Sequence, residues 1–528
     1  MKSDLTSIGM AHRKISGRPV ATLAPEAILV GKDVLELLSS AMYVDPLSVY
    51  REYVQNAADA IDDARREGLL RADEAGRVDF SFDSTARSVR IRDNGTGIPC
   101  EDFVRVLTSI GGSSKRGTQA RGFRGVGRLA GLAYAQELVF RSRAVGETMV
   151  SEMRWDCRRL KSAMRATDFS GGLEELIRHV VTGSQIEPTD YPERFFEVEL
   201  RGIVRLRSDK LMTPSAVEDF LSQVAPVPFA PEFGFGAEIS AALQAVMPGP
   251  PLHIHIAGSD RPVYRPHRDT FDVGGGRLDR FEEVEIVHIP AMDGGRAALV
   301  WVLHHGYEGA IPASNLVKGL RLRVGNIQIG DTILLEELFA EPRFNSWSVG
   351  EVHVLDSRIV PNARRDNFEQ NAHWNNLVNQ LGPIAREISR RCRSSSIRRN
   401  WLRRFELADA DVAQSVGAMS QPMSDTERQA TAVRADAAIK EMRRIAGMRV
   451  LVDQQNLLTL ADKRAEELVE ARAAIAAAAS PLEAFPPHER AVWERCFGLI
   501  RECSVNRVAA GKLIDRIVQR AAAPSQGV

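Results

Sequence analysis

The segment Arg51-Glu-Tyr-Val-Gln-Asn-Ala-Ala-Asp-Ala-Ile61 carries apolar and polar residues at helical spacing. This spacing predicts a helix that begins near residue 45. Glu52, Asn56 and Asp59 are spaced i, i+4 and i+7, so they share one helix face. A carboxylate on such a face can polarise a water, and an amide oxygen can ligate Mg²⁺. The same pattern is typical of a solvated polar face, so this segment alone leaves both interpretations open.

A short motif and a long loop, both rich in glycine, follow. Asp93-Asn-Gly-Thr-Gly97 comes directly after a predicted strand, where glycines let the backbone approach a ligand and Asp93 can accept from an exocyclic amine. A plain Asn-Gly hairpin turn is the alternative interpretation. The stretch Ser109–Gly131 presents backbone N–H groups to phosphates, and Lys115 adds a mobile positive charge. It lacks the Lys-Ser/Thr of a P-loop, and a flexible linker is its alternative interpretation.

The surrounding pattern predicts an α+β sandwich for the first part of the chain. Period-two alternation predicts strands at residues 78–82, 88–92, 137–142, 148–155 and 195–200. The proline-rich stretch 225–231 predicts a domain boundary, because proline breaks both helices and ladders. We therefore expect an N-terminal tail at 1–25, a sandwich domain at 26–225, an α/β middle domain at 226–375 and an all-helical region at 376–528.

Composition excludes several classes of protein. Of 528 residues, 44% are hydrophobic and 26% are charged, which excludes a largely disordered chain. Lys+Arg and Asp+Glu both number 69, so no net charge attracts nucleic acid or membrane. Apolar stretches fall short of the ~18–20 residues that span a bilayer, and the N-terminus lacks the apolar core of a signal peptide. The five scattered cysteines disfavour a disulfide framework or a zinc site. These features predict a cytoplasmic protein without a membrane partner.

Taken in order, the three motifs resemble those of the GHKL ATPases, which include type II topoisomerases, heat shock protein 90, histidine kinases and mismatch-repair clamps. The first domain is most similar to heat shock protein 90, and the resemblance covers about residues 25–375. It implies a Bergerat-type α/β sandwich that binds ATP with Mg²⁺, followed by an α/β middle (transducer) domain. It also implies a Mg-dependent ATPase that hydrolyses ATP to ADP and phosphate.

The resemblance implies roles for individual residues. Glu52 would be the general base, Asn56 would ligate Mg²⁺, and Asp93 would bind the adenine amine. The other ATP-binding residues that it implies are Asp59 on the same helix face, Gly97 beside the adenine, Lys115 in the ATP lid, and Gly122, Gly125 and Gly127 at the phosphates.

Two positions depart from the family pattern. The family usually has an aromatic residue where Arg128 stands. It also has a Gly-Thr pair on a late strand, and the equivalent here is Phe195-Phe196, so a hydroxyl partner of the adenine site is missing. The purine pocket is then either altered or completed by a water molecule, which leaves nucleotide preference open.

A loop in the second domain supports the same resemblance. The stretch Gly350–Glu369 is similar to the middle-domain catalytic loop of heat shock protein 90, in which an arginine reaches the γ-phosphate. Arg365 is the matching position, with Arg364 as the near alternative, and Lys318 is a second candidate cation. An arginine there would neutralise charge on the transferring phosphoryl group. The alternative is an arginine paired with a carboxylate in a surface loop.

Three functions stay open. The first is a heat-shock-protein-90-like chaperone clamp that closes on a protein client, with homodimerisation implied by the resemblance. The second is a GHKL clamp on nucleic acid, of mismatch-repair or microrchidia type and acting in genome defence, favoured by eight arginines and Trp401 within Arg386–Arg404. The third is a non-catalytic scaffold, against which the intact Glu52 argues. A histidine kinase and a topoisomerase subunit are excluded, because no phospho-acceptor helix precedes Glu52 and no acidic cleavage domain follows.

Overall fold

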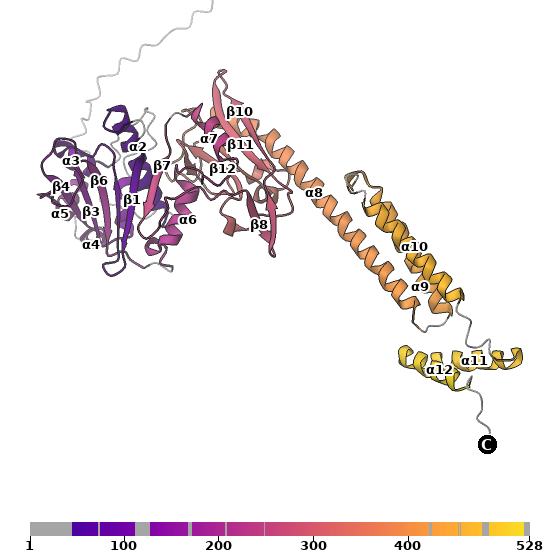
Figure 1. Ribbon diagram of the computed structural model, residues 1–528. Coiled ribbons are helices and arrows are strands. Elements are labelled where there is room, and N and C mark those ends of the chain that lie inside the picture. Colours follow the sequence, from indigo (N-terminus) through magenta and orange to yellow (C-terminus); the bar gives the residue numbers. More distant parts are fainter. Residues whose placement is uncertain are drawn as a thin grey trace, which may run out of the picture.

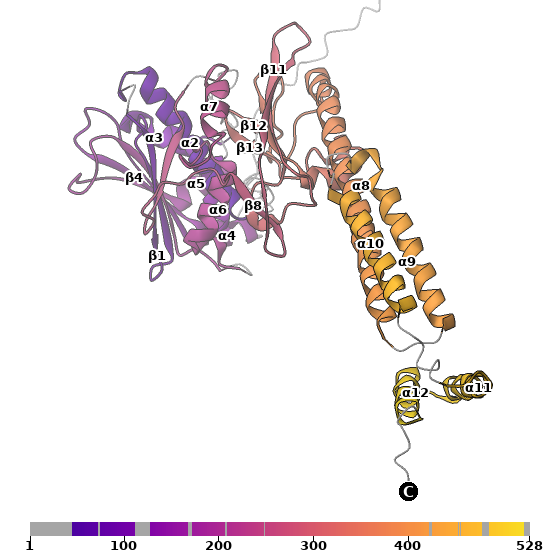
Figure 2. The ribbon, with the colours of Figure 1, turned by 45° about the vertical axis from the view of Figure 1, so that its right-hand side comes forward.

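The computed structural model describes residues 45–71, 74–110, 127–166, 172–205, 208–247, 249–421, 425–451, 454, 456–477 and 485–521. Two units built on β-sheets lie side by side, and a long helix leads from the second unit to a set of helices (Figures 1 and 2). This arrangement confirms the predicted fold class of an α+β first unit, an α/β middle unit and an all-helical C-terminal region.

The first unit is built on a seven-stranded sheet with the order β5-β4-β3-β6-β2-β1-β7. Its strands are β1 (Gly76–Asp83), β2 (Ser88–Asp93), β3 (Glu137–Arg143), β4 (Val150–Asp156), β5 (Val181–Ile186), β6 (Phe195–Arg201) and β7 (Leu252–Ile256). All neighbours are antiparallel except β1 and β7, which run parallel. Strand β7 thus follows the proline-rich stretch and returns to the first sheet, while the domain boundary expected at residue 226 stays a prediction.

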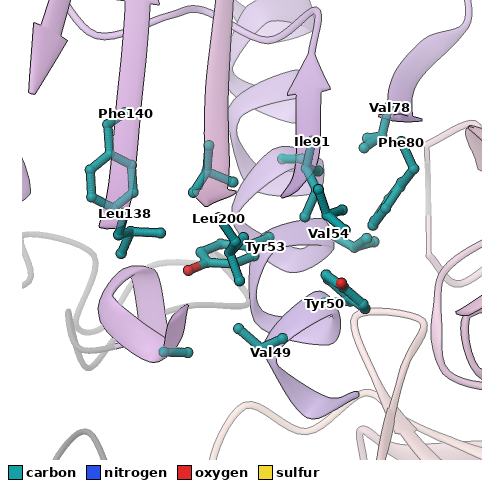
Figure 3. Packing of buried hydrophobic residues seen from close by; sticks show 14 of the residues in the cluster. Val49, Tyr50, Tyr53, Val54, Val78, Phe80, Ile91, Leu138, Phe140 and Leu200 are labelled. Atoms are coloured by element: carbon teal, nitrogen blue, oxygen red, sulfur yellow. The ribbon is translucent and has the colours of Figure 1, made fainter. Parts of the chain in front are cut away.

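Helix α2 (Ser48–Arg66) packs on one face of this sheet (Figure 3). Its apolar side chains recur at helical spacing and are buried against Phe80, Ile91, Leu138 and Leu200 from four strands. Burial of each such large side chain stabilises the fold by roughly 1.5–3 kcal/mol. This packing fixes the rotation of α2 and so turns its polar residues away from the sheet. The same core receives α3 (Cys100–Thr108), the 3₁₀ helix η1 (Gly127–Ala133), α4 (Cys157–Arg165), α5 (Leu173–Val180) and α6 (Pro214–Val224).

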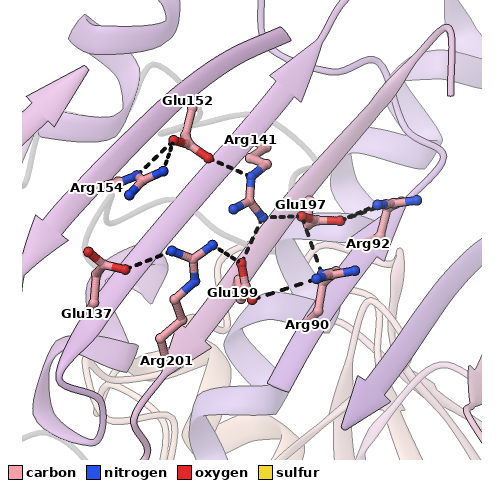
Figure 4. A network of polar contacts seen from close by, with 9 residues as sticks. All are labelled: Arg90, Arg92, Glu137, Arg141, Glu152, Arg154, Glu197, Glu199 and Arg201. Carbon is pink, nitrogen blue, oxygen red and sulfur yellow. Dashed lines mark hydrogen bonds and ion pairs between the residues drawn. The ribbon is translucent and has the colours of Figure 1, made fainter. Parts of the chain in front are cut away.

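The opposite face of the first sheet carries a network of arginines and glutamates (Figure 4). At its centre the Arg141 guanidinium lies 2.7 Å from Glu152, 2.7 Å from Glu197 and 2.8 Å from Glu199. All four side chains are nearly inaccessible to solvent. Further contacts come from Arg90, Arg92, Arg154, Arg201 and Glu137. The arginine stems cover the strands while their charges pair, so this face of the sheet is polar although its central charges are buried.

The second unit has a five-stranded sheet with the order β10-β11-β14-β12-β13. Its strands are β10 (Glu283–Pro290), β11 (Arg296–His304), β12 (Gly319–Val324), β13 (Ile327–Ile329) and β14 (Val349–Val354), and a separate hairpin is formed by β8 (Thr270–Gly274) and β9 (Arg277–Arg280). Alternate residues of β11 enter two different cores, one containing the start of α8 and the other α7 (Gly236–Gln244). Such burial on both faces accounts for the continuous apolar run along β11.

Every regular element described from residue 372 onward is helical. These helices are α8 (Ala372–Met419), α9 (Asp425–Ala446), α10 (Asn456–Ala477), α11 (Pro487–Cys503) and α12 (Arg507–Ala521), with the 3₁₀ helix η6 (Arg449–Leu451) between α9 and α10. Asn371 caps α8 by accepting a hydrogen bond from the Trp374 N–H at 2.9 Å. Helices α9 and α10 pack on the distal part of α8 around a core of their own. Within the described ranges, no helix is long and apolar enough to cross a membrane.

The Arg141 network predicts a stability effect. Arg141→Met leaves three buried carboxylates with less compensation, so we expect unfolding free energy to fall by about 3 kcal/mol. Chemical denaturation followed by circular dichroism measures this change. The control is Arg178→Met, which breaks an exposed pair with Glu174 and should cost less than about 1 kcal/mol. Equal losses for the two variants would contradict a structural role for the network.

Candidate functional site

The polar face of α2 forms one side of the candidate site. Glu52 and Asp59 are buried, with 5% and 3% of their surface exposed, and Asn56 is half-buried between them along the helix. The helix therefore brings together the three side chains that the sequence spacing predicted to share a face. Glu52 and Asp59 are not solvated, so the interpretation of this face as an ordinary polar surface is wrong.

The segment that follows the glycine-rich loop lies directly on this face. A Cβ atom at Gly127 would stand 2.4 Å from Oε2 of Glu52, so η1 begins in direct contact with the carboxylate, and a larger residue there would displace the Glu52 side chain. One turn further, the Gly131 N–H donates to the Tyr53 hydroxyl at 2.9 Å. The loop that the sequence assigns to the phosphates thus ends against Glu52. Lys115, Gly122 and Gly125 lie outside the described residues.

The Asp93 motif forms the second side of the site. Asp93 accepts a hydrogen bond from the Gly95 N–H at 2.8 Å, and the Thr96 N–H donates to the Ala60 carbonyl of α2 at 3.2 Å. Gly97 has a φ of +70°, and a Cβ there would lie 2.4 Å from the Arg143 carbonyl oxygen. The motif is therefore a turn held against both α2 and β3, and Gly97 is required by close packing.

Asp93 has unusual acid–base properties. Burial raises the pKa of its carboxyl to about 7, although the Gly95 N–H and the charge of Arg194 favour the carboxylate. Sequence reasoning did not single out Arg194, which donates to the carbonyls of Asn94 and Gly95 and so supports the turn. A lone arginine before a strand gives no signal of this kind.

The structure places both departures from the family pattern, Phe196 and Arg128, in the first unit. Phe196 pairs with Asp93 across the sheet and stacks on Phe140. On its other side lies Ser142, a buried serine that sequence reasoning missed. The Ser142 hydroxyl accepts from the Ile98 N–H at 2.6 Å and donates to the Phe195 carbonyl at 3.2 Å, so it holds the end of the Asp93 turn. Arg128 donates to the Val106 carbonyl of α3.

A tight loop of the second unit presents an arginine to the first. Residues 361 and 368 form a β-bridge, and Asn362 closes the loop by donating to the Asp366 carboxylate at 2.6 Å. Arg365 stands at the tip with a φ of +56°, an uncommon conformation for a residue with a side chain. Its carbonyl accepts from the Gly330 N–H at 2.8 Å. The hydrogen bond to Gly330 therefore holds the backbone of the loop, while the Arg365 side chain extends toward Glu52.

The guanidinium of Arg365 meets the carboxylate of Glu52. Its Nε lies 3.4 Å from Oε1 of Glu52, and Nε of Arg51 lies 3.8 Å from the same oxygen. Arg51 also donates to the Arg364 carbonyl at 3.4 Å, while the Arg364 side chain is exposed. Of the two adjacent arginines proposed from the sequence, Arg365 is therefore the one whose side chain reaches Glu52. The carbonyl of Lys318, the other candidate cation, accepts from Arg321.

The polar face of α2 also offers an oxygen ligand for a metal ion. Among the described residues, no three His, Cys, Asp or Glu side chains gather to hold a metal. At nucleotide sites, however, Mg²⁺ is usually bound through one or two protein oxygens together with substrate phosphates and water. Asn56 offers such an oxygen one turn along α2 from Glu52, whose buried Oε1 accepts no hydrogen bond. These residues fit a Mg²⁺ ion that arrives with a nucleotide.

The arginine cluster 386–404 on α8 is engaged in contacts within the chain. Arg390 and Arg391 pair with Glu387, Arg393 pairs with Glu341, and Arg404 pairs with Glu441. Arg399 donates to the Glu308 carbonyl and lies over the Trp347 ring. Arg390 and Arg391 thus pair within α8, Arg393 and Arg399 join α8 to the second unit, and Arg404 joins it to α9.

Comparison with known proteins agrees with the geometry of the first unit. The family described as histidine kinase-, DNA gyrase B-, and HSP90-like ATPase matches residues 46–169. This match confirms the predicted GHKL resemblance for that segment, which carries Glu52, Asn56, Asp59, Asp93 and Gly97.

Curated relatives point in the same direction. The chain is similar to the chaperone protein HtpG of Polaromonas naphthalenivorans, with 27% identity over 199 residues (34% of this chain, 30% of the relative). It is also similar to HtpG of Chromobacterium violaceum, with 25% identity over 201 residues (35% and 30%), and of Methylibium petroleiphilum, with 28% over 202 residues (35% and 31%). The matched segment spans about 30% of the length of these relatives.

The raised pKa of Asp93 predicts a pH-dependent stability. Between pH 3.8 and about 7 the unfolded chain ionises Asp93 while the folded chain does not. Stability of the wild type should therefore fall relative to Asp93→Asn by up to about 1.4 kcal/mol per pH unit in this range, and the difference should become constant above pH 7. Urea denaturation of both proteins from pH 5 to 8 measures this. Asp190→Asn, at an exposed carboxyl, is the control and should run parallel to wild type; parallel curves for Asp93→Asn would refute the assignment.

Proposed function

We propose that the chain is a Mg²⁺-dependent ATPase in which Glu52 is the general base and Arg365 neutralises charge on the γ-phosphate. The observation that carries this proposal is the 3.4 Å approach of Arg365, from the second unit, to Glu52 in the first. A cation brought from a separate unit to a buried carboxylate beside a glycine-rich segment is the arrangement that phosphoryl transfer needs.

In the proposed reaction, water attacks the γ-phosphorus of ATP and the bond to ADP breaks. Glu52 takes the proton of the attacking water, and the products are ADP and phosphate. Mg²⁺, when bound, supplies charge neutralisation at the phosphate oxygens, with Asn56 as its protein ligand. Asp93 accepts a hydrogen bond from the adenine amine, with Gly97 packed beside it. Asp59 supports the same helix face, and Lys115, Gly122, Gly125 and Gly127 bind the phosphates.

The ion pair between Arg365 and Glu52 suggests how the base becomes available. In the ion pair, the Arg365 guanidinium lies 3.4 Å from Oε1 of Glu52 and so occupies an oxygen that would otherwise face the attacking water. The γ-phosphate of ATP carries more negative charge than Glu52 and competes for Arg365. Transfer of Arg365 to the phosphate then leaves Glu52 free to accept the proton and places the cation where charge develops.

We further infer that the clamp acts on protein clients, as a homodimeric chaperone in the cytoplasm. Support comes from the relatives, which carry the name chaperone, and from the two-unit arrangement around Glu52 and Arg365. A clamp on nucleic acid is the second candidate, favoured by the density of arginines at 386–404. Their pairing with Glu341, Glu387 and Glu441 favours the protein client, because paired arginines release fewer counterions from phosphates.

ATP turnover separates these functions. At fixed salt we expect wild type to hydrolyse ATP and Glu52→Ala to retain less than about 1% of the rate, because general-base catalysis contributes about 10²–10⁴-fold. Titration of duplex DNA should leave the wild-type rate unchanged within about two-fold, since Arg390, Arg391, Arg393 and Arg404 already pair with glutamates. A several-fold, Glu52-dependent stimulation by DNA would favour the nucleic-acid clamp. Equal rates for wild type and Glu52→Ala would leave only a nucleotide-binding scaffold.

The two adjacent arginines supply a matched pair of variants. Arg365→Ala should lower kcat by at least about 100-fold with little change in KM, because its side chain acts on the transferring group. Arg364→Ala should change kcat by less than about three-fold, since only its carbonyl contacts Arg51 and the substitution keeps that carbonyl. Steady-state phosphate release at saturating ATP measures both. The reverse ranking would move the role to Arg364.

A further inference from the structure

A cluster of charged residues is buried in the second unit, on the face of the sheet opposite α8. Arg321 and Arg323 lie on β12, Glu351 lies on β14, and Arg265 lies in the chain between β7 and β8. All four are 4% exposed or less. Glu351 pairs with Arg265 and, at 2.6 Å, with Nε of Arg323. Their neighbours Leu320, Leu322 and Val352 point the other way, into the core beneath α8.

This cluster holds more positive than negative charge. Burial lowers the pKa of the adjacent His267 and His353 to about 3 and about 4, so both imidazoles are neutral at physiological pH. Burial also lowers the pKa of Arg321 to about 10 and of Arg323 to about 9, which leaves both guanidinium groups charged. Three cations therefore face one carboxylate in a region without access to water. Other negative or dipolar groups must compensate them.

Carbonyl groups at the end of α6 supply that compensation. Arg323 donates to the carbonyls of Gln223 and Ala225, the latter at 3.3 Å, and Arg265 donates to the Val227 carbonyl at 3.1 Å. Arg321 donates to the Gln223 side chain at 3.2 Å. Helix α6 ends at Val224, so these cations meet the negative end of its dipole. The three arginines thereby attach the second sheet to the last helix of the first unit.

The hairpin of β12 and β13 also contacts the loop that carries Arg365. Arg321 contacts Gln328 on β13 at 3.4 Å, and Gln328 donates to the Gly330 carbonyl at 3.1 Å. The Gly330 N–H in turn donates to the carbonyl of Arg365. On the other side, the Tyr50 hydroxyl of α2 donates to the Leu211 carbonyl just before α6, at 2.6 Å. A continuous chain of contacts therefore runs from α2 through α6, β12 and β13 to Arg365 and back to Glu52.

We propose that Arg321, Arg323 and Glu351 are positioning residues that set the approach of Arg365 to Glu52 by clamping the β12–β13 hairpin onto the end of α6. The inference rests on the proposed ATPase function and adds residues that touch neither nucleotide nor Glu52. Its physical basis is geometric, because a misplacement of about 1 Å in a catalytic group can cost about 100-fold in rate.

The test replaces Arg323 in the full chain. Arg323→Met removes the guanidinium and should lower kcat for ATP by about ten-fold or more while KM stays within about two-fold, since the nucleotide contacts lie elsewhere. Arg323→Lys keeps the charge and should recover part of the rate, and it replaces the Met variant if that one does not fold. The control is Arg464→Met, which removes an arginine paired with Asp409 in the distal helices and should leave kcat unchanged within about two-fold.

A double variant distinguishes positioning from general damage. If Arg323 acts through Arg365, Arg323→Met should change the residual rate of Arg365→Ala by less than about two-fold, because the group that it positions is already gone. A further ten-fold loss in that background, or an unchanged kcat for Arg323→Met alone, would overturn the proposal.

Hydrogen exchange gives a readout that does not need turnover. Peptides covering residues 327–332 and 361–368 should exchange faster in Arg323→Met than in wild type, while peptides of α10 should not. Unchanged exchange at both peptides would overturn the clamp even in an active enzyme. Absence of Glu52-dependent turnover in wild type, with faster exchange in the variant, would instead reject the ATPase and keep the clamp as an attachment between the units.

Discussion

The carboxylate of Glu52 is buried, and a buried carboxylate costs several kcal/mol unless cations and donors approach it. Two arginines meet this requirement, Arg51 from the same helix and Arg365 from the second unit. The first of these is local and follows from sequence adjacency. The second comes from a loop more than 300 residues further along the chain, and its Nε lies 3.4 Å from Oε1 of Glu52. Apolar packing places α2 on the first sheet, and the Arg365–Glu52 contact then joins the same helix to the loop of the second unit.

Two buried arginine networks serve this arrangement in different ways. The Arg141 network lies on the face of the first sheet opposite α2 and joins neighbouring strands of one unit. The cluster of Arg265, Arg321 and Arg323 pairs with one carboxylate, that of Glu351. Carbonyl groups at and just after the end of α6 therefore accept further hydrogen bonds from its arginines. An excess of buried cations is therefore what makes the second network an attachment between units, because its compensation lies across the junction.

Much of the first unit could be predicted from the sequence, since its signals are local. Helical spacing predicted α2 and its polar face, and period-two alternation predicted the strands from β1 to β4 and β6. Strand β5 was missed because it lies at the sheet edge, with four central residues exposed and polar or small. The pairing of β7 with β1 could not be predicted, because alternation identifies a strand but not its partner.

The site was harder to predict wherever distant elements meet. Motif spacing and the family resemblance predicted Glu52, Asn56 and Asp93, and their roles stay predictions. The contact of the Arg365 side chain with Glu52 depends on the fold of a distant loop, in which Arg365 has a positive φ. Arg321 and Arg323 alternate with leucines on β12, a pattern typical of a strand with one face in water. In the structure, that face of β12 contacts the end of α6. Alternation alone cannot distinguish a face in water from a face that contacts another unit.

The loop that carries Arg365 is followed directly by α8, the longest helix among the described residues. Phe368, at the closing bridge of the loop, stacks on Trp374 in the first turn of α8 with ring centroids 4.6 Å apart. Helix α8 has 48 residues, which at 1.5 Å per residue corresponds to about 72 Å. On the proposed mechanism, ATP draws Arg365 from Glu52 to the phosphate, and the hydrogen-bonded loop moves with it. Because the first turns of α8 are also packed in the core of the second unit, a movement of that unit toward the phosphate would carry α8 with it. On the proposed mechanism, phosphate binding beside Glu52 would thereby move the distal helices through α8.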